Sequence, residues 1–132
     1  MESLRFHHIG YAVKDIQQTA EFYLKQGWTI TREIVDPIQN TNIAFLQRDN
    51  FPLIELVSPV DETSPVYKNI SRGGVQPYHI CYSVEDINKA IKELRQEKFI
   101  ALFAPVPAVA IENKKICYLY SNKVGLIELV ER

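Results

Sequence analysis

The chain has 132 residues, of which 46% are hydrophobic and 23% are charged, a composition typical of one compact globular domain with a substantial core. The formal net charge is −1 and the Lys and Arg residues are scattered among acidic ones, so there is no basic stripe for phosphates and nucleic acid is excluded as a partner. The apolar runs fall far short of the about 18–20 residues that span a bilayer, and the N-terminus lacks the apolar stretch of a signal peptide, so we expect a cytoplasmic protein without membrane contact.

Two segments of the chain occur twice. Residues 8–16 read HIGYAVKDI and residues 79–87 read HICYSVEDI, with six of the nine positions identical. Residues 53–57 and 126–130 both read LIELV. The first two segments lie 71 residues apart and the second two 73, so a two-residue insertion in the second copy reconciles them. We interpret the chain as a tandem duplication.

Each copy is expected to contain a strand, a helix and three further strands, in that order. The first strand is rich in Ile, Val and Tyr, and the helix follows an Asp, a preferred N-cap residue that is Asp15 in the first copy. Apolar residues then recur at helical spacing. The strands are predicted near residues 6–13, 28–35, 42–47 and 53–57, and again near 78–84, 99–104, 116–120 and 126–130.

These elements predict a single domain, residues 1–132, made of two βαβββ modules. Module one covers about residues 5–58 and module two about residues 77–132. The connector between them, residues 58–76, contains Pro and Gly residues and is expected to fold back near residues 63–70.

A His and a Glu recur at equivalent places in the two copies. His8 and His79 share their strand face with small residues only, which leaves room for a cavity. Glu55 and Glu128 lie inside the LIELV strands, whose apolar neighbours predict burial on both faces. A buried carboxylate must be protonated, paired or bound to a cation. A pseudo-twofold axis would bring the two His and two Glu together, and these ligands suit nickel, zinc, cobalt, manganese or iron.

A single His on a strand is more often structural than a metal ligand, and a single Glu in an apolar strand can face solvent at a sheet edge. Both of these simpler roles are less favoured here because the His and the Glu recur as a set. His7 points to the opposite face from His8 and its counterpart is Tyr78, so we expect it to be structural. Cys81 and Cys117 have no matching cysteine in the first copy and are interpreted as buried thiols rather than a disulfide.

The sequence resembles the vicinal oxygen chelate superfamily, and within it the glyoxalase I and methylmalonyl-CoA epimerase groups. The segments that carry the resemblance are HHIGYAVKDI, IELVSPVDETSPV, YHICYSVEDI, KICYLYS and GLIELVE. The resemblance implies an α+β fold in which the two modules form a curved, half-open mixed sheet around a metal site. It implies metal ligation by His8, Glu55, His79 and Glu128, with one divalent ion per chain, nickel, cobalt or zinc being favoured.

The resemblance also implies a reaction. A divalent ion acts as a Lewis acid on a substrate oxygen, and a carboxylate moves the neighbouring C–H proton. By resemblance Glu128 is the base, and Glu55 faces it as the second catalytic glutamate. A curved half-open sheet exposes edges and apolar surface, which with the resemblance predicts a homodimer.

The leading expectation is a glyoxalase I-like lyase or isomerase acting on the thiol adduct of a 2-oxoaldehyde. The alternative is an acyl-CoA epimerase of the methylmalonyl-CoA type. Such epimerases carry an extra proton-transferring glutamate in the first module, where this chain has Ile38 or Gln39, with Asp36 close by. A ring-opening dioxygenase is disfavoured, and a non-enzymatic binder of the bleomycin-resistance type normally lacks the ligand set.

Overall fold

The computed structural model describes residues 1–132, which form two compact units. The first unit is residues 8–78, and the second unit is residues 79–132 together with residues 1–7. The α-helices have 10 residues at most, and none is long and apolar enough to cross a membrane.

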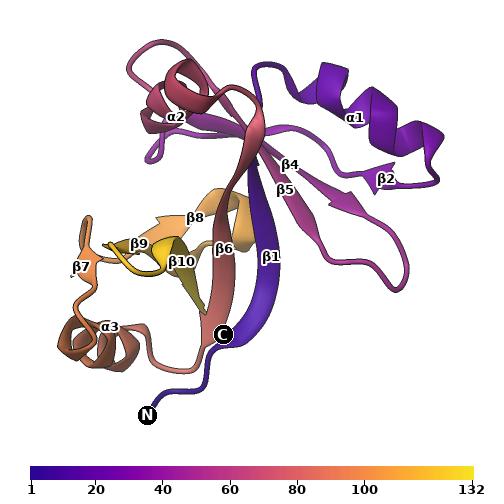
Figure 1. Ribbon diagram of the computed structural model, residues 1–132. Coiled ribbons are helices and arrows are strands. Elements are labelled where there is room, and N and C mark those ends of the chain that lie inside the picture. The colour runs from indigo at the N-terminus through magenta and orange to yellow at the C-terminus, as the bar shows by residue number, and fades with distance from the viewer. The chain divides into compact units, whose positions relative to one another are not determined.

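The elements of the first module follow the predicted order. They are β1 (Arg5–Ala12), α1 (Ile16–Lys25), β2 (Thr29–Ile30), β3 (Ile34–Asp36), β4 (Thr41–Gln47), β5 (Ile54–Pro59) and, in the connector, α2 (Pro65–Gly73). The strand order is β2-β4-β5-β1, with β3 also paired to β4. Strands β1 and β5 are parallel and the other pairs are antiparallel, so the sheet of this module is mixed. Figure 1 shows α1 lying along β2, β4 and β5.

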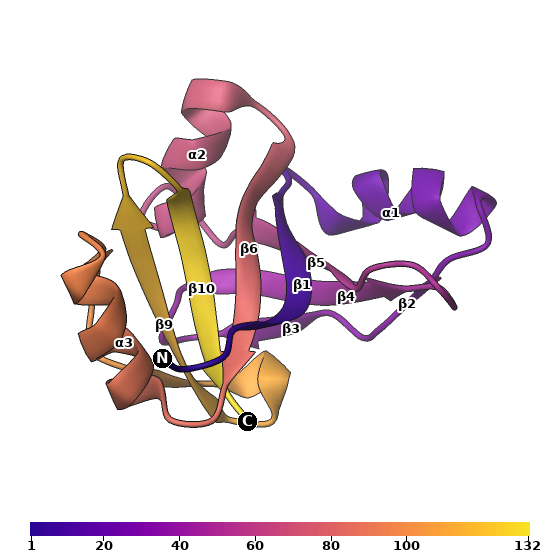
Figure 2. The ribbon, with the colours of Figure 1, turned by 60° about the horizontal axis from the view of Figure 1, so that its bottom comes forward.

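The second module repeats this topology. Its elements are β6 (Gln76–Val84), α3 (Ile87–Gln96), β7 (Ile100–Ala101), β8 (Val106–Ala108), a 3₁₀ turn (Val109–Ile111), β9 (Lys114–Ser121) and β10 (Gly125–Glu131). The strand order is β6-β10-β9-β7, with β8 paired to β9. Figure 2 shows β9 and β10 side by side, and α3 packs on these two strands.

The register of the strands confirms the duplication. In the first module Glu55 lies opposite Gly10 on one side and Phe45 on the other. In the second module Glu128 lies opposite Cys81 and Tyr118, which occupy the equivalent positions. The predicted α+β class with two tandem modules is therefore confirmed by the pairing of the strands.

Both predicted helix starts are confirmed. The carboxylate of Asp15 accepts a hydrogen bond from the backbone N–H of Gln18 at 3.0 Å, and Asp86 accepts one from Lys89 at 3.1 Å. Each cap pairs an N–H that the first helical turn leaves without a partner.

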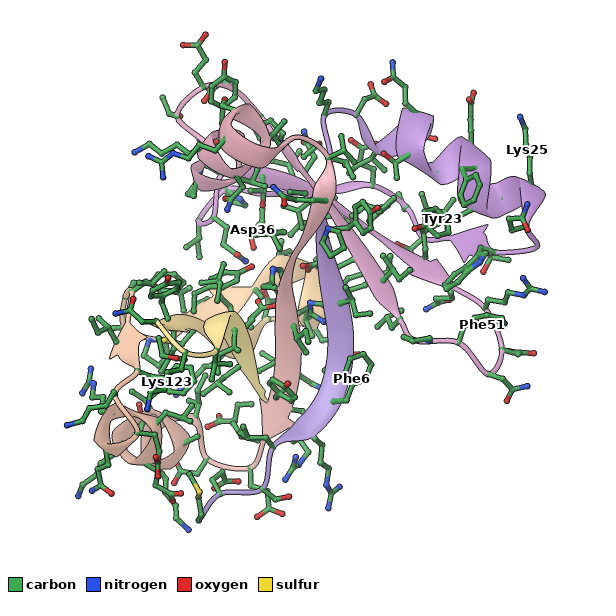
Figure 3. The ribbon with its side chains drawn as sticks, viewed as in Figure 1. Phe6, Tyr23, Lys25, Asp36, Phe51 and Lys123 are labelled. Carbon is green, nitrogen blue, oxygen red and sulfur yellow. The ribbon has the colours of Figure 1, made fainter.

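Each helix then buries its apolar face on its own sheet. The first core contains α1, β4, β5 and an aromatic corner in which Trp28 contacts the rings of Tyr23 and Phe51. Figure 3 labels Tyr23 and Phe51. The second core contains the buried residues Ile87, Ile91 and Leu94 of α3 with Leu119 and Leu129.

The strands that follow each helix are shorter than the pattern predicts. The strand expected near residues 28–35 is two pieces, β2 and β3, because the side chain of Thr31 accepts the hydrogen bond from the N–H of Phe45 that a continuing strand would take. In the second module β7 ends at Ala101, and Pro105 and Pro107, which have no N–H to donate, flank the start of β8. The fold-back expected near residues 63–70 is the helix α2.

Candidate metal centre

His8 and Glu55 meet inside the first unit. His8 lies on β1, two residues before Gly10, which is the parallel partner of Glu55 on β5. This register puts both side chains on one face of the sheet, and the missing side chain of Gly10 leaves space between them. The Nε2 atom of His8 lies 3.3 Å from Oε1 of Glu55, and both side chains are buried. The ring of Phe45 packs edge-on against the imidazole at 5.7 Å.

His79 and Glu128 form the same arrangement inside the second unit. Glu128 on β10 is the parallel partner of Cys81 on β6, and His79 lies two residues before Cys81. The Nε2 atom of His79 lies 3.2 Å from Oε1 of Glu128, with relative exposures of 4% and 1% for the two residues. Tyr118 packs edge-on against the imidazole at 5.1 Å, as Phe45 does in the first unit.

The donor atoms of each pair suit a divalent transition-metal ion. Imidazole nitrogen and carboxylate oxygen are the ligands that nickel, cobalt and zinc take in proteins. Each unit offers one nitrogen and one oxygen from buried side chains held by neighbouring strands. A buried carboxylate is costly unless its negative charge is compensated, and a divalent cation bound by the carboxylate and the imidazole would supply that compensation. The four residues predicted from the sequence are therefore brought together as two chemically identical pairs.

The cysteines of the second module are buried thiols, as the sequence indicates. Cys81 and Cys117 are both 0% exposed. The thiol of Cys117 donates a hydrogen bond to the carbonyl of Phe103 at 3.1 Å and lies in the core under α3. Burial raises the pKa of Cys117 above its ordinary value. The Cys117 thiol lies on the opposite face of the sheet from Glu128 and belongs to the core packing rather than to the candidate metal centre.

The stretch where epimerases carry their extra glutamate is organised around Asp36, the last residue of β3 (Figure 3). The buried Asp36 carboxylate accepts hydrogen bonds from the backbone N–H groups of Ile38 and Gln39, both at 3.0 Å. Its second oxygen accepts a bond from the Gln39 side-chain amide at 2.8 Å. The side chain of Ile38 is 58% exposed. Asp36 thus fixes this turn with both of its oxygens, and neither Ile38 nor Gln39 has a group that could move a proton.

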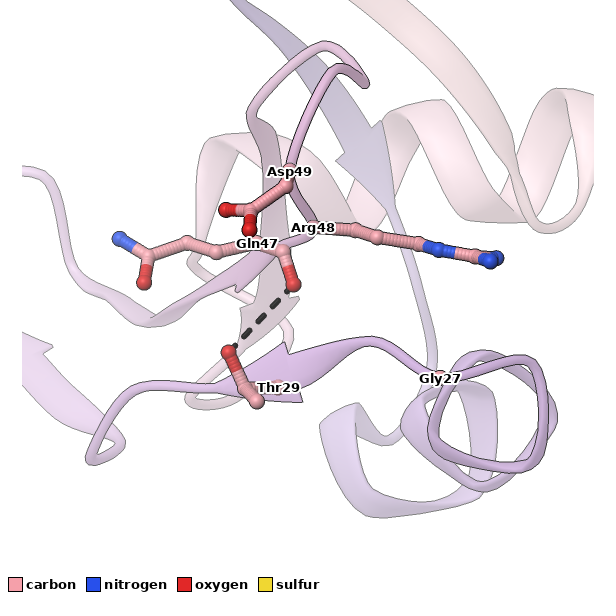
Figure 4. A pocket seen from close by; sticks show the side chains of 5 residues that line it. All are labelled: Gly27, Thr29, Gln47, Arg48 and Asp49. Carbon is pink, nitrogen blue, oxygen red and sulfur yellow. Dashed lines mark hydrogen bonds between the residues drawn. The ribbon is translucent and has the colours of Figure 1, made fainter.

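The first unit also contains an open pocket that no sequence motif indicates. The pocket has a volume of about 530 Å³ and is lined by Gly27, Thr29, Gln47, Arg48 and Asp49 (Figure 4). The Thr29 hydroxyl donates to the backbone carbonyl of Gln47 at 3.4 Å. Arg48 stacks over the ring of Phe51, with 4.7 Å between its guanidinium carbon and the ring centre. The pocket is polar, and its residues come from the ends of β2 and β4, which the sequence pattern does not place together.

A model of the glyoxalase/bleomycin resistance protein/dioxygenase superfamily matches residues 7–118. The chain belongs to this superfamily. The resemblance inferred from the repeated motifs is thereby confirmed, and the α+β fold agrees with the solved structures of its members.

The similar proteins of known activity are mostly epimerases. The mitochondrial methylmalonyl-CoA epimerase of Homo sapiens is 28% identical over 95% of this chain and 72% of its own length. The ethylmalonyl-CoA/methylmalonyl-CoA epimerase of Cereibacter sphaeroides is 28% identical over 95% of this chain and 96% of its own. A variant of Streptomyces coelicolor methylmalonyl-CoA epimerase, solved with 2-nitronate-propionyl-CoA, has a TM-score of 0.83 and 26% identity, covering 98% of both chains.

A match to a glyoxalase is shorter. The lactoylglutathione lyase of Schizosaccharomyces pombe is 30% identical over 74% of this chain and only 36% of its own length. The comparisons therefore favour the epimerase alternative over the leading expectation of a glyoxalase I-like lyase. The sequence motifs do not make this distinction, because the resemblance implies the same ligand set for both groups.

Proposed function

We propose that the protein is a metal-dependent acyl-CoA epimerase of the methylmalonyl-CoA type. The observation that carries the proposal is the pair of buried His–Glu sets in equivalent register, in a chain whose epimerase relatives match it almost from end to end. We propose that the two modules form one domain, in which His8, Glu55, His79 and Glu128 ligate one divalent ion. Nickel, cobalt and zinc are the proposed ions.

In such a reaction, some residues of the chain would hold the metal ion and others would transfer the proton. When bound, a divalent ion would supply Lewis-acid stabilisation of the charge that develops on the thioester oxygen. His8 and His79 are buried and edge-packed by aromatic rings, which fix the direction of each imidazole. The apolar strands around Glu55 and Glu128 keep bulk water away from both carboxylates, which strengthens electrostatic interactions at the site.

Epimerisation requires a proton to leave the acidic carbon on one face and to return on the other. We propose that Glu128 removes the proton and that Glu55 is the second acid–base group. Asp36 is a poor candidate for that second role because both of its oxygens already accept hydrogen bonds within its own turn. Two glutamates in equivalent positions of duplicated modules meet the chemical need for one group on each side of a planar carbanion.

A glyoxalase I-like lyase remains the second candidate function. It is favoured by Ile38 and Gln39, which stand where epimerases have the extra glutamate, and by the lactoylglutathione lyase match. Such a reaction also moves a proton beside a thioester-forming carbon and uses the same ligands. It differs in its substrate, which is the adduct of a thiol with a 2-oxoaldehyde. We further propose that the protein is a homodimer in the cytoplasm. Light scattering that reports a monomer at micromolar concentration would refute the proposed dimer.

The test is a substrate comparison on the purified, metal-reconstituted chain. An epimerase will exchange the acidic C–H proton of methylmalonyl-CoA with deuterium from solvent and will interconvert the two epimers. The same preparation is assayed with methylglyoxal and several thiols, and Glu128→Gln is the matched inactive control. Turnover of the thiol adducts alone would move the assignment to the lyase. Ligand binding without proton exchange in any substrate would refute both and indicate a non-enzymatic binder.

A further inference from the structure

Glu128 shares its face of the sheet with three exposed apolar side chains. Side chains alternate along a strand, so Leu126 lies on the same face as Glu128, and Leu126 is the cross-strand partner of Tyr120. Tyr120 is in turn the partner of Ile100 on β7. Leu102 follows two residues after Ile100, and its N–H donates to the carbonyl of Tyr118 at 2.9 Å. We call Ile100, Leu102 and Tyr120 the apolar strip; they are 66%, 55% and 43% exposed.

The apolar strip is not part of the hydrophobic core of the second unit. The opposite face of the same strands is already buried under α3 by Ala101, Leu119 and Ile127. The residues of the strip therefore contribute little to folding, since they lie where the fold needs no apolar group. An apolar side chain kept on the ligand face of the sheet is available to something that binds there.

The duplication supplies an internal comparison. The positions equivalent to Ile100, Leu102 and Tyr120 in the first unit are Thr29, Thr31 and Gln47, because the registers Ile100–Tyr120 and Thr29–Gln47 correspond. The N–H of Thr31 donates to the carbonyl of Phe45, just as that of Leu102 donates to Tyr118. All three first-unit residues are polar, and two of them line the pocket in Figure 4. Equivalent strand positions therefore carry polar side chains in the first module and apolar side chains in the second.

We propose that the apolar strip binds an alkyl branch of several carbons on the acyl group of the substrate; this rests on the proposed epimerase function. A residue rise of about 3.4 Å and a strand spacing of about 4.8 Å put Tyr120 roughly 8 Å from Glu128. An extended alkyl chain gains roughly 1.3 Å per bond, from a C–C bond of about 1.5 Å, so a methyl branch falls short and a chain of about five to seven carbons reaches the strip.

Two other occupants fit the strip less well. Coenzyme A is polar and anionic, and it would leave these uncharged side chains without matching groups. A second copy of the chain would need about 800 Å² per partner for a stable interface, far more than three side chains provide. An alkyl chain needs only a narrow apolar surface that begins beside the reacting carbon.

The experiment is calorimetric titration of the metal-loaded chain with free coenzyme A and with propionyl-, butyryl-, hexanoyl- and octanoyl-CoA. Each buried methylene is expected to lower Kd about two- to fourfold. The swap variant Ile100→Thr, Leu102→Thr, Tyr120→Gln introduces the first module's own residues. It should reduce the dependence of Kd on chain length to below about 1.5-fold per methylene, while the Kd of propionyl-CoA changes less than about twofold. Phe22→Gln, a 63% exposed residue of α1, is the matched control and should keep the dependence.

Three results would overturn the proposal. They are an unchanged chain-length dependence in the swap variant, an equal loss of affinity for free coenzyme A and all thioesters, and a loss of dimer in light scattering. The single variant Ile100→Thr repeats the test at the most exposed position if the triple variant unfolds. A chain-length dependence that the swap removes, in a protein without any proton exchange, would refute the proposed function and support the strip as an alkyl-binding surface.

Discussion

Replacing His8 or His79 by Ala removes one ligand from a proposed set of four. Four-ligand sites for zinc bind with about 10–16 kcal/mol, which is about 3 kcal/mol per ligand, so each substitution should weaken metal binding by at least about 100-fold. Absolute stability is a poor readout, because truncating a fully buried imidazole next to Glu55 also leaves a cavity in the metal-free protein. The useful quantity is the rise in Tm that the metal produces in each variant.

The size of that rise follows from mass action. At a free metal concentration of about 100 times the wild-type Kd, binding stabilises the folded state by about 2.7 kcal/mol. In a chain of this size 1 kcal/mol raises Tm by about 3–4 °C, so the wild-type Tm should increase by about 9 °C. After a 100-fold loss of affinity the same metal concentration equals Kd, and the stabilisation falls to about 0.4 kcal/mol, or about 1–2 °C.

The assay is scanning calorimetry of chelator-treated protein with and without nickel, cobalt or zinc, together with elemental analysis. His7→Ala is the control, because His7 neighbours His8 in sequence but has Tyr78 as its counterpart in the second copy and so lies outside the repeated His–Glu set. It should keep the full metal-induced rise in Tm. One metal ion per chain in the His8→Ala, His79→Ala double variant would refute the ligand assignment.

Four further outcomes are expected. Glu128→Gln should lower turnover about 10²–10⁴-fold in a proton-exchange assay while elemental analysis finds metal still bound, because an amide can ligate but cannot accept a proton. Mixing His8→Ala chains with Glu128→Gln chains should restore no activity, since each site is proposed to lie within one chain. Lys98→Gly should raise Tm by about 2–4 °C, because Lys98 has a φ of 71° at the position that Gly27 fills after α1. Burial raises the pKa of Cys117, so its contribution to stability is present below pH about 8.5 and falls at higher pH; denaturant titrations should find a flatter decline in Cys117→Ala.

The sequence points to four candidate ligands because a duplicated chain allows each motif to be compared with its own copy. A His two residues before a small residue and a Glu inside LIELV are weak signals alone, but their recurrence 71 and 73 residues later requires the same register in both modules. The structure has that register, Gly10 opposite Glu55 and Cys81 opposite Glu128. Period-two alternation then fixes which side chains share a face.

Other features depend on contacts that no local pattern contains. The break between β2 and β3 arises from a bond between Thr31 and Phe45, residues 14 apart in sequence. The polar pocket and the apolar strip each combine residues from two strands joined only in the folded sheet. The choice between epimerase and lyase rests on similarity along the whole chain, since the ligand set is common to both. Motifs therefore predict the chemistry of the site, while substrate preference depends on the residues around it.

The comparison of the two modules suggests how such a site can be specific. We propose that the two equivalent His–Glu pairs make one ligand set with pseudo-twofold symmetry, and such a set by itself cannot distinguish the two ends of a substrate. The orientation of the substrate must therefore be set by positions at which the two modules differ. Phe45 and Tyr118 keep the same packing on the histidines, whereas Thr29 and Ile100 differ in polarity at equivalent register. The residues nearest the candidate ligands thus remain alike, whereas the exposed face of the outer strands is polar in the first module and apolar in the second.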